Sequence, residues 1–169
     1  MKVFNDLRLN KTVYRINIGQ TYTTKEPDVV LNTLVGSCIS VCMVDKTNGV
    51  YGINHFMLPG SNHKYNKDPK YGAYATDLLI EQMVEKGADR KHMEARVFGA
   101  GKVIDQDIFE VGTNNANFIL KYLGALKIPI VHSDLGGDYG RNILYFCNTS
   151  EVVVHKIANN NSTNGVLEK

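Results

Sequence analysis

The sequence predicts a mixed α/β fold of the α+β-like kind, a single domain in which β-layers and hairpins are flanked by two main helices. Three observations predict it. Strand-like stretches lie near both ends of the chain, a strong hairpin signal at Asn48-Gly49 separates two apolar runs, and two segments with helical spacing lie in the middle. Hairpins at both ends are not the pattern of a doubly wound parallel sheet.

The length and composition fit one globular domain. The chain has 169 residues, of which 43% are hydrophobic and 21% charged. A chain of this size buries roughly 70% of the surface that its unfolded form exposes, so it folds without covalent cross-links. We expect one domain over residues 1–158 and a polar, flexible tail over residues 159–169.

Alternation and turn residues place the strands. An Asn-Gly pair favours a hairpin because both residues tolerate positive φ, and Lys25-Glu26-Pro27-Asp28 is a turn before an apolar run. The expected strands cover residues 13–19, a segment from 29, the runs on either side of Asn48-Gly49, 94–99, 128–132, and a final hairpin of 142–148 with 151–157.

Two helices are expected between these strands. Asp68-Pro69 is a start signal for the first, which Gly87 ends, and Thr113 is a suitable N-cap for the second, which ends at Gly124. Residues 61–70 before the first helix are polar and without period. They predict a surface loop where a substrate-facing flap could lie.

No arm or stripe of basic residues indicates nucleic-acid binding, since the net charge is +2 and the basic residues are scattered. The N-terminus lacks the apolar region of a signal peptide, and no apolar run approaches the ~20 residues that span a bilayer. Three cysteines, an odd number, are then expected to be reduced thiols. We therefore expect a cytoplasmic protein with no direct membrane insertion.

A cysteine and a histidine form the leading candidate site. Cys38 follows a Gly-Ser break at the start of an apolar strand, and His55 lies in the next apolar run. A nearby imidazolium lowers the pKa of a thiol below its free value of about 8.5, and amide groups at a Gly-Ser bend can receive an oxyanion. The alternative is that both residues fill the core, and residue chemistry alone favours it because buried, unreactive cysteines are common.

The hairpin register decides whether the two side chains can meet. A two-residue turn at Asn48-Gly49 puts His55 opposite Cys42, with Cys38 roughly 13 Å further along. A four-residue loop over 46–49 puts His55 opposite Ser40, and Cys38 becomes its diagonal neighbour at about 7–8 Å between Cα atoms. The sequence leaves both loops open, and in both the side chains share one face.

Metal binding is the rival interpretation of these residues. Its ligands would be Cys38, Cys42, His55 and His63, but their spacing lacks the tight knuckle of structural zinc sites. The glycine pairs at Gly99-Ala100-Gly101 and Gly136-Gly137 match no phosphate-binding loop. We expect neither a metal nor a cofactor.

Several segments, in their order along the chain, resemble the chemoreceptor glutamine deamidase family, CheD. The resemblance covers about residues 13 to 157, and its most specific part is Gly36-Ser37-Cys38 with a histidine seventeen residues further on. The segments are Gly36 to Asp45, Asn54-His55-Phe56-Met57-Leu58-Pro59, Lys70-Tyr71, Glu94-Ala95-Arg96-Val97-Phe98-Gly99, Val111-Gly112-Thr113-Asn114-Asn115, and Asp134-Leu135-Gly136-Gly137 with Arg141.

The resemblance implies a cysteine hydrolase that converts selected glutamines to glutamate on the cytoplasmic helices of chemotaxis receptors. Cys38 would be the nucleophile, and His55 would activate it and protonate the departing ammonia. The CheC phosphatase is the implied protein partner, and no cofactor is implied.

The third catalytic residue departs from the family pattern. The family commonly has a threonine six residues before the cysteine, and Asn32 occupies that position here, with Thr33 next to it. Asn32 is the first choice because an asparagine can orient a histidine, and Thr33 is the second. The substitution also motivates an alternative function, a non-catalytic module that docks to CheC or receptors; a structural zinc protein is a third hypothesis.

Overall fold

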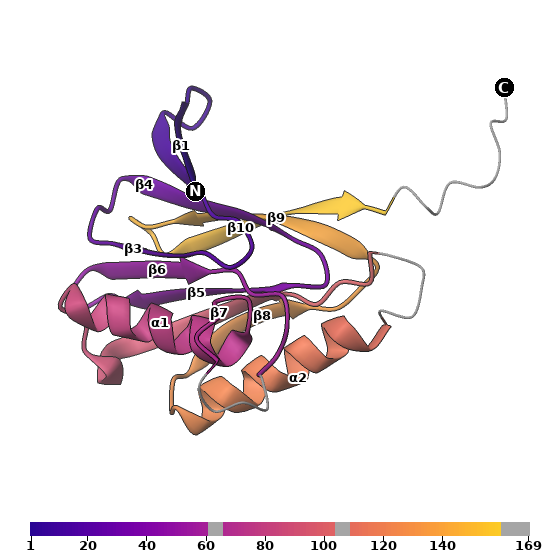
Figure 1. Cartoon of the computed structure of the whole chain (residues 1–169). Helices are drawn as coiled ribbons and strands as arrows, with labels where there is room; N and C mark the ends of the chain where they lie inside the picture. Colours follow the sequence, from indigo (N-terminus) through magenta and orange to yellow (C-terminus); the bar gives the residue numbers. More distant parts are fainter. Residues whose placement is uncertain (61–65, 104–108, 160–169) are drawn as a thin grey trace, which may run out of the picture.

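Two five-stranded sheets pack against each other, and two helices cover the outer face of one of them, so the molecule has three layers (Figure 1). The computed structural model describes residues 1–60, 66–103 and 109–159. The mixed α/β class with β-layers, hairpins and two main helices is confirmed.

The first sheet, sheet A, is built from both ends of the chain. Its order is β1-β2-β4-β9-β10, and its pairs are antiparallel except for the parallel pair of β2 and β4. The strands are β1 (Lys2–Asp6), β2 (Lys11–Arg15), β4 (Val29–Val35), β9 (Tyr139–Phe146) and β10 (Glu151–Ala158).

The second sheet, sheet B, lies in the middle of the molecule and comes largely from the middle of the chain. Its order is β3-β6-β5-β7-β8, antiparallel except between β7 and β8. The strands are β3 (Thr21–Thr24), β5 (Ile39–Asp45), β6 (Val50–Asn54), β7 (Met93–Gly99) and β8 (Ile130–Leu135). The helices are α1 (Gly72–Glu85), a single 3₁₀ turn η1 (Arg90–His92), and α2 (Phe109–Ala125).

Strand β5 is buried along its whole length because both of its faces are covered. Ile39, Val41 and Met43 belong to the core cluster that includes the helices, whereas Cys42, and Cys38 just before the strand, belong to the cluster between the sheets. This alternation explains the run of apolar residues on both faces, which a half-exposed strand would lack.

The hairpin between β5 and β6 has the four-residue loop. Asp45 pairs with Val50, and residues 46–49 form the loop. The Asp45 carboxylate accepts hydrogen bonds from the Asn48 backbone N–H at 3.1 Å and from Asn48 Nδ2 at 2.7 Å. The buried aspartate thus closes a wider loop than the Asn-Gly pair alone favours.

Some element boundaries differ from the predictions. The second helix begins at Phe109, so Thr113 lies inside it and is not an N-cap. Part of the predicted flap, residues 61–65, and the tail from 160 lie outside the described residues. Across the described ranges, none of the helices has the length and apolar character needed to cross a membrane.

Candidate active site

Cys38 lies where the chain passes from one sheet to the other. Strand β4 of sheet A ends at Val35, residues 36–38 form a bend, and β5 of sheet B begins at Ile39. Cys38 therefore lies directly before the first residue of strand β5, as predicted. Its residue is buried, with 8% of its surface exposed.

All three carbonyl oxygens of this bend accept hydrogen bonds from neighbouring segments. The backbone N–H groups of Gly101 and Ala100 donate to the oxygens of Gly36 and Cys38 at 2.8 and 2.9 Å. Asn115 of α2 donates from Nδ2 to the oxygen of Ser37 at 3.1 Å. The bend is thus fixed from outside by the glycine-rich segment after β7 and by a helix.

The Asn115 side chain also reaches the segment that carries the histidine. The same Nδ2 donates to the backbone oxygen of Met57 at 2.9 Å, two residues after His55. One fully buried amide group therefore joins the cysteine bend to the histidine segment. Asn115 was not among the predicted site residues; an asparagine on the buried face of an amphipathic helix is the signal that could have indicated it.

His55 faces the space between the sheets and contacts sheet A. Its Nδ1 lies 2.9 Å from Oγ1 of Thr33 in β4, and the Thr33 hydroxyl lies 2.8 Å from the backbone oxygen of Ile16. Because the hydroxyl has one proton and donates it to that carbonyl, it accepts from Nδ1–H. The proton is therefore assigned to Nδ1, and Nε2 has a free lone pair.

The register of β5 and β6 brings Cys38 and His55 together. Ile39 and Phe56 form the last bridge of the hairpin, so His55 is opposite Ser40 and diagonal to Cys38. The expected separation is about 7–8 Å between Cα atoms, within reach of the side chains. Nε2 of His55 has no hydrogen-bond partner among the described residues.

Burial keeps both groups neutral. It lowers the pKa of His55 to about 4 and raises the pKa of the Cys38 thiol above its ordinary value, against a smaller lowering by the residue's own backbone N–H. The expected thiolate–imidazolium pair is therefore not the resting state. A neutral imidazole beside a neutral thiol has the protonation state that a general base requires.

The hydrogen bonds of Asn32, the first choice for the third residue, go to residues other than His55. Its Nδ2 donates to Asn142 Oδ1 at 2.7 Å and to the Ile143 oxygen at 2.8 Å, and its Oδ1 accepts from Nε of Arg15 at 2.9 Å. Asn32 points to the outer face of sheet A and Thr33 to the inner face. A count of positions back from Cys38 does not give the face of either residue, because the bend lies between strands of different sheets and the alternation of side chains is not continuous.

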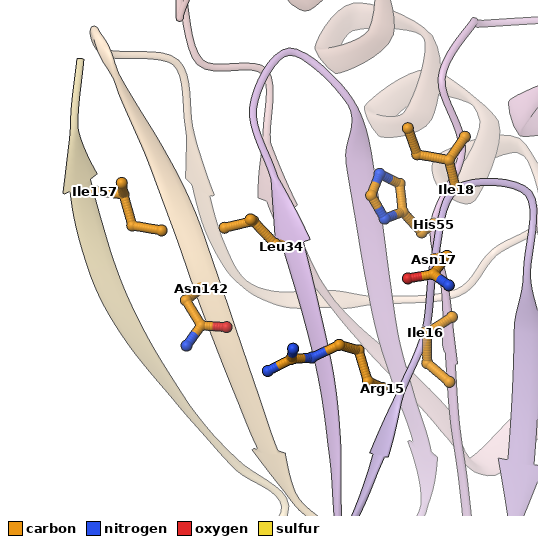
Figure 2. A pocket seen from close by; sticks show the side chains of 8 residues that line it. All are labelled: Arg15, Ile16, Asn17, Ile18, Leu34, His55, Asn142 and Ile157. Atoms are coloured by element: carbon orange, nitrogen blue, oxygen red, sulfur yellow. The ribbon is translucent and has the colours of Figure 1, made fainter. Parts of the chain in front are cut away.

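A groove of about 620 Å³ reaches His55 from the outer side of sheet A (Figure 2). Cys38 is not among its lining residues, so the groove approaches the pair from the histidine side. The lining residues are Arg15, Ile16, Asn17, Ile18, Leu34, His55, Asn142 and Ile157.

The metal interpretation has no geometric support in the described part of the chain. It contains no group of three or more His, Cys, Asp or Glu side chains placed to hold an ion. Cys42 and Cys147 are buried, unpaired thiols in the core between the sheets. His63, another ligand considered, lies outside the described residues.

The chain is similar in sequence to known proteins over most of its length. A probable chemoreceptor glutamine deamidase CheD of Methylobacillus flagellatus is 37% identical over 161 residues, which cover 92% of this chain and 79% of that protein. A protein of the same description from Cupriavidus metallidurans is 35% identical over 167 residues, 95% of this chain and 76% of its own.

A solved structure, the hypothetical protein YfiH of Bacillus licheniformis, has a TM-score of 0.45 at 13% identity, covering 68% of this chain and 49% of that one. The model of the family described as CheD chemotactic sensory transduction matches residues 57–156. That match begins after Cys38 and His55, which are included in the long alignments with the relatives. With the family model matching more than half of the chain and such relatives aligned along nearly all of it, the chain belongs to the CheD family.

Proposed function

We propose that this protein deamidates glutamine side chains of chemoreceptors, with Cys38 as nucleophile, His55 as general base and acid, and Thr33 as the residue that orients the histidine. The observation that carries the proposal is the hydrogen bond between Thr33 Oγ1 and His55 Nδ1, which leaves Nε2 free beside the cysteine bend. The names of the relatives supply the substrate class.

The first half of the reaction forms a thioester. His55 Nε2 takes the thiol proton as Sγ of Cys38 attacks the side-chain amide carbon of glutamine. The resulting oxyanion would accept hydrogen bonds from N–H groups of the bend beside Cys38. The C–N bond then breaks, and the imidazolium gives its proton to the leaving nitrogen, which departs as ammonia.

The second half restores the enzyme. Neutral His55 takes a proton from water as the water oxygen attacks the thioester, and the C–S bond breaks. The imidazolium returns a proton to the sulfur, so the products are a glutamate side chain and the free thiol. No step uses a metal or an organic cofactor.

Turnover on a receptor cytoplasmic fragment tests the proposal. The wild-type protein should release ammonia and raise the mass of the fragment by about 1 Da for each converted glutamine, since an amide –NH2 becomes –OH. Cys38→Ala should abolish both signals, while Cys42→Ala, a change at a buried thiol of the same strand face, should keep them. Full turnover by Cys38→Ala would refute the assignment.

The docking-module alternative loses its motivation, because Asn32 in place of threonine suggested it and Thr33 makes the contact with the histidine. The cytoplasmic location is proposed from the composition and the N-terminal sequence, and the CheC partner from the resemblance. We expect purified CheC to bind the full chain, and the absence of a complex by gel filtration and calorimetry would remove that partner.

A further inference from the structure

The groove beside His55 opens because two neighbouring strands end at different points. Strand β2 pairs with β4 only as far as Asn32, opposite Arg15, whereas β4 continues to Val35 and pairs there with β9 alone. The chain after Arg15 leaves sheet A and leads to β3 of sheet B. Beyond the end of β2 the outer surface of sheet A is therefore open down to the histidine (Figure 2).

The wall of the groove is aliphatic and unusually accessible. Ile18 is 46% exposed, Leu34 is 58% exposed and Ile157 is 44% exposed, and all three line the cavity. A cavity of about 620 Å³ falls within the range of ~300–1,000 Å³ typical of binding clefts. Exposed apolar side chains that line one groove together with His55 indicate a surface that a ligand covers.

Among the described residues that line this groove, Arg15 alone has a charged side chain, because His55 is neutral. Its Nε is held by Asn32 Oδ1, and Asn32 is itself held by Asn142 and the Ile143 carbonyl. The guanidinium also lies over the ring of Phe4, 5.4 Å from its centroid. Asn32 thus holds the guanidinium of Arg15 in a fixed position at the edge of the groove.

No carboxylate pairs with Arg15 in the described ranges. Asp6, which lines an adjoining cavity together with Arg15, accepts hydrogen bonds from the backbone N–H groups of Arg8 and Leu9. The terminal nitrogens of Arg15 therefore offer charge-assisted donors to a ligand, and a guanidinium pairs best with a carboxylate.

From this geometry we propose that the groove receives the residues flanking the target glutamine, with aliphatic side chains against Ile18, Leu34 and Ile157 and a carboxylate against Arg15. The inference rests on the proposed function for the identity of the target, but the binding step itself needs no turnover. It assigns Asn32 a part in substrate selection, as the residue that positions Arg15.

Peptide binding to the full-length Cys38→Ala protein tests this without chemistry. Two short peptides are used, identical in a central glutamine and flanking leucines, one with a glutamate beside the glutamine and the other with a lysine there. We expect the glutamate peptide to bind more tightly by on the order of tenfold, the worth of one charge-assisted pair. Adding Arg15→Gln should remove that preference, and Arg15→Glu should reverse it.

Two matched changes serve as controls. Lys121→Gln removes one positive charge from an exposed side chain of α2 that does not line the groove. It should leave the preference for the glutamate peptide intact. Ile157→Ser should weaken both peptides, whereas Val153→Ser, on the same strand with similar exposure but outside the groove, should not.

The outcomes separate this inference from the proposed function. Equal affinity for the two peptides, no measurable binding of the glutamate peptide, or a preference that survives Arg15→Gln would overturn the docking inference. A preference that reverses with Arg15→Glu, in a wild-type protein that releases no ammonia from receptor fragments, would sustain the docking inference and overturn the deamidase.

Discussion

At the scale of single residues, the hydroxyl of Thr33 determines which nitrogen of His55 carries the proton. It donates to the Ile16 carbonyl and so can only accept from Nδ1–H. A side chain of the same shape without the hydroxyl would keep the packing and lose this assignment. Replacing Thr33 with such a side chain therefore distinguishes a role in orienting His55 from a role in packing alone.

We expect Thr33→Val to lower kcat by on the order of 100-fold, because the imidazole can then adopt the tautomer or ring orientation in which Nε2 is not a base. KM should change little, since Thr33 does not line the groove. The measurement is steady-state ammonia release as a function of pH. Thr33→Ser keeps the hydroxyl and should restore most of kcat; an equally inactive Thr33→Ser would point to packing instead.

The choice between Thr33 and Asn32 shows what the sequence could not predict at the scale of residues, namely which of the two side chains contacts His55. Cys38 and His55 were identified from the Gly-Ser break, the spacing and the resemblance, and the structure places them on one face. For the residue behind the histidine, Asn32 was the first choice and Thr33 the second, and the order is uncertain from sequence because the face of Thr33 depends on a bend between two sheets. A local pattern of alternation contains no information about such a crossing.

At the scale of elements, helix α2 connects the bend that carries Cys38 to the segment that carries His55. Asn115 donates to the oxygens of Ser37 and Met57, one on each side of the pair. These two carbonyls are within reach of one amide only if the bend and the histidine segment keep their relative position.

We expect Asn115→Ala to lower kcat about 10-fold or more, since a misplacement near 1 Å at a reacting centre is costly. Loss of two buried hydrogen bonds should also lower the free energy of unfolding by about 1–3 kcal/mol. Ammonia release and urea unfolding measure the two effects. Asn114→Ala changes an exposed neighbour in the same helix and should leave both unaltered; a loss of stability with unchanged kcat would limit Asn115 to a structural role.

The hairpin of β5 and β6 shows why element boundaries were harder to predict than element types. Asn48-Gly49 correctly indicated a hairpin, but the loop has four residues because the Asp45 carboxylate binds Asn48 and also accepts from the Asp89 backbone N–H at 2.8 Å. Asp89 is distant in sequence, so the register that joins Cys38 to His55 depends on tertiary contacts. Local turn preference could not supply it.

At the scale of the whole molecule, the site exists only when both sheets are assembled. Thr33 comes from sheet A, His55 follows β6 of sheet B, and Cys38 lies between them. Sheet A combines the strands expected at 13–19 and from 29 with the expected final hairpin, and it also includes β1, which was not predicted. No local pattern indicated that the two ends of the chain share one sheet. The interior between the sheets is also what desolvates the histidine.

This burial makes stability depend on pH. The pKa of His55 is about 4 in the folded protein, against an ordinary 6.5. Between these values the unfolded chain binds a proton that the native protein does not, so the free energy of unfolding is highest above pH 6.5 and falls as the pH drops toward 4. The full difference corresponds to at most about 3 kcal/mol.

We therefore expect urea unfolding of the wild-type protein between pH 7 and pH 4.5 to show a decline in stability that His55→Gln reduces, because glutamine does not titrate. Carboxylates such as Asp134, whose pKa is lowered by hydrogen bonding to Arg141, also weaken the fold in acid. The informative quantity is therefore the difference in slope between the two proteins. His155→Gln replaces an exposed histidine of β10 and should keep the wild-type slope. Equal slopes for the wild type and His55→Gln would mean that the histidine is hydrated in solution, and the neutral-pair mechanism would then lose its basis.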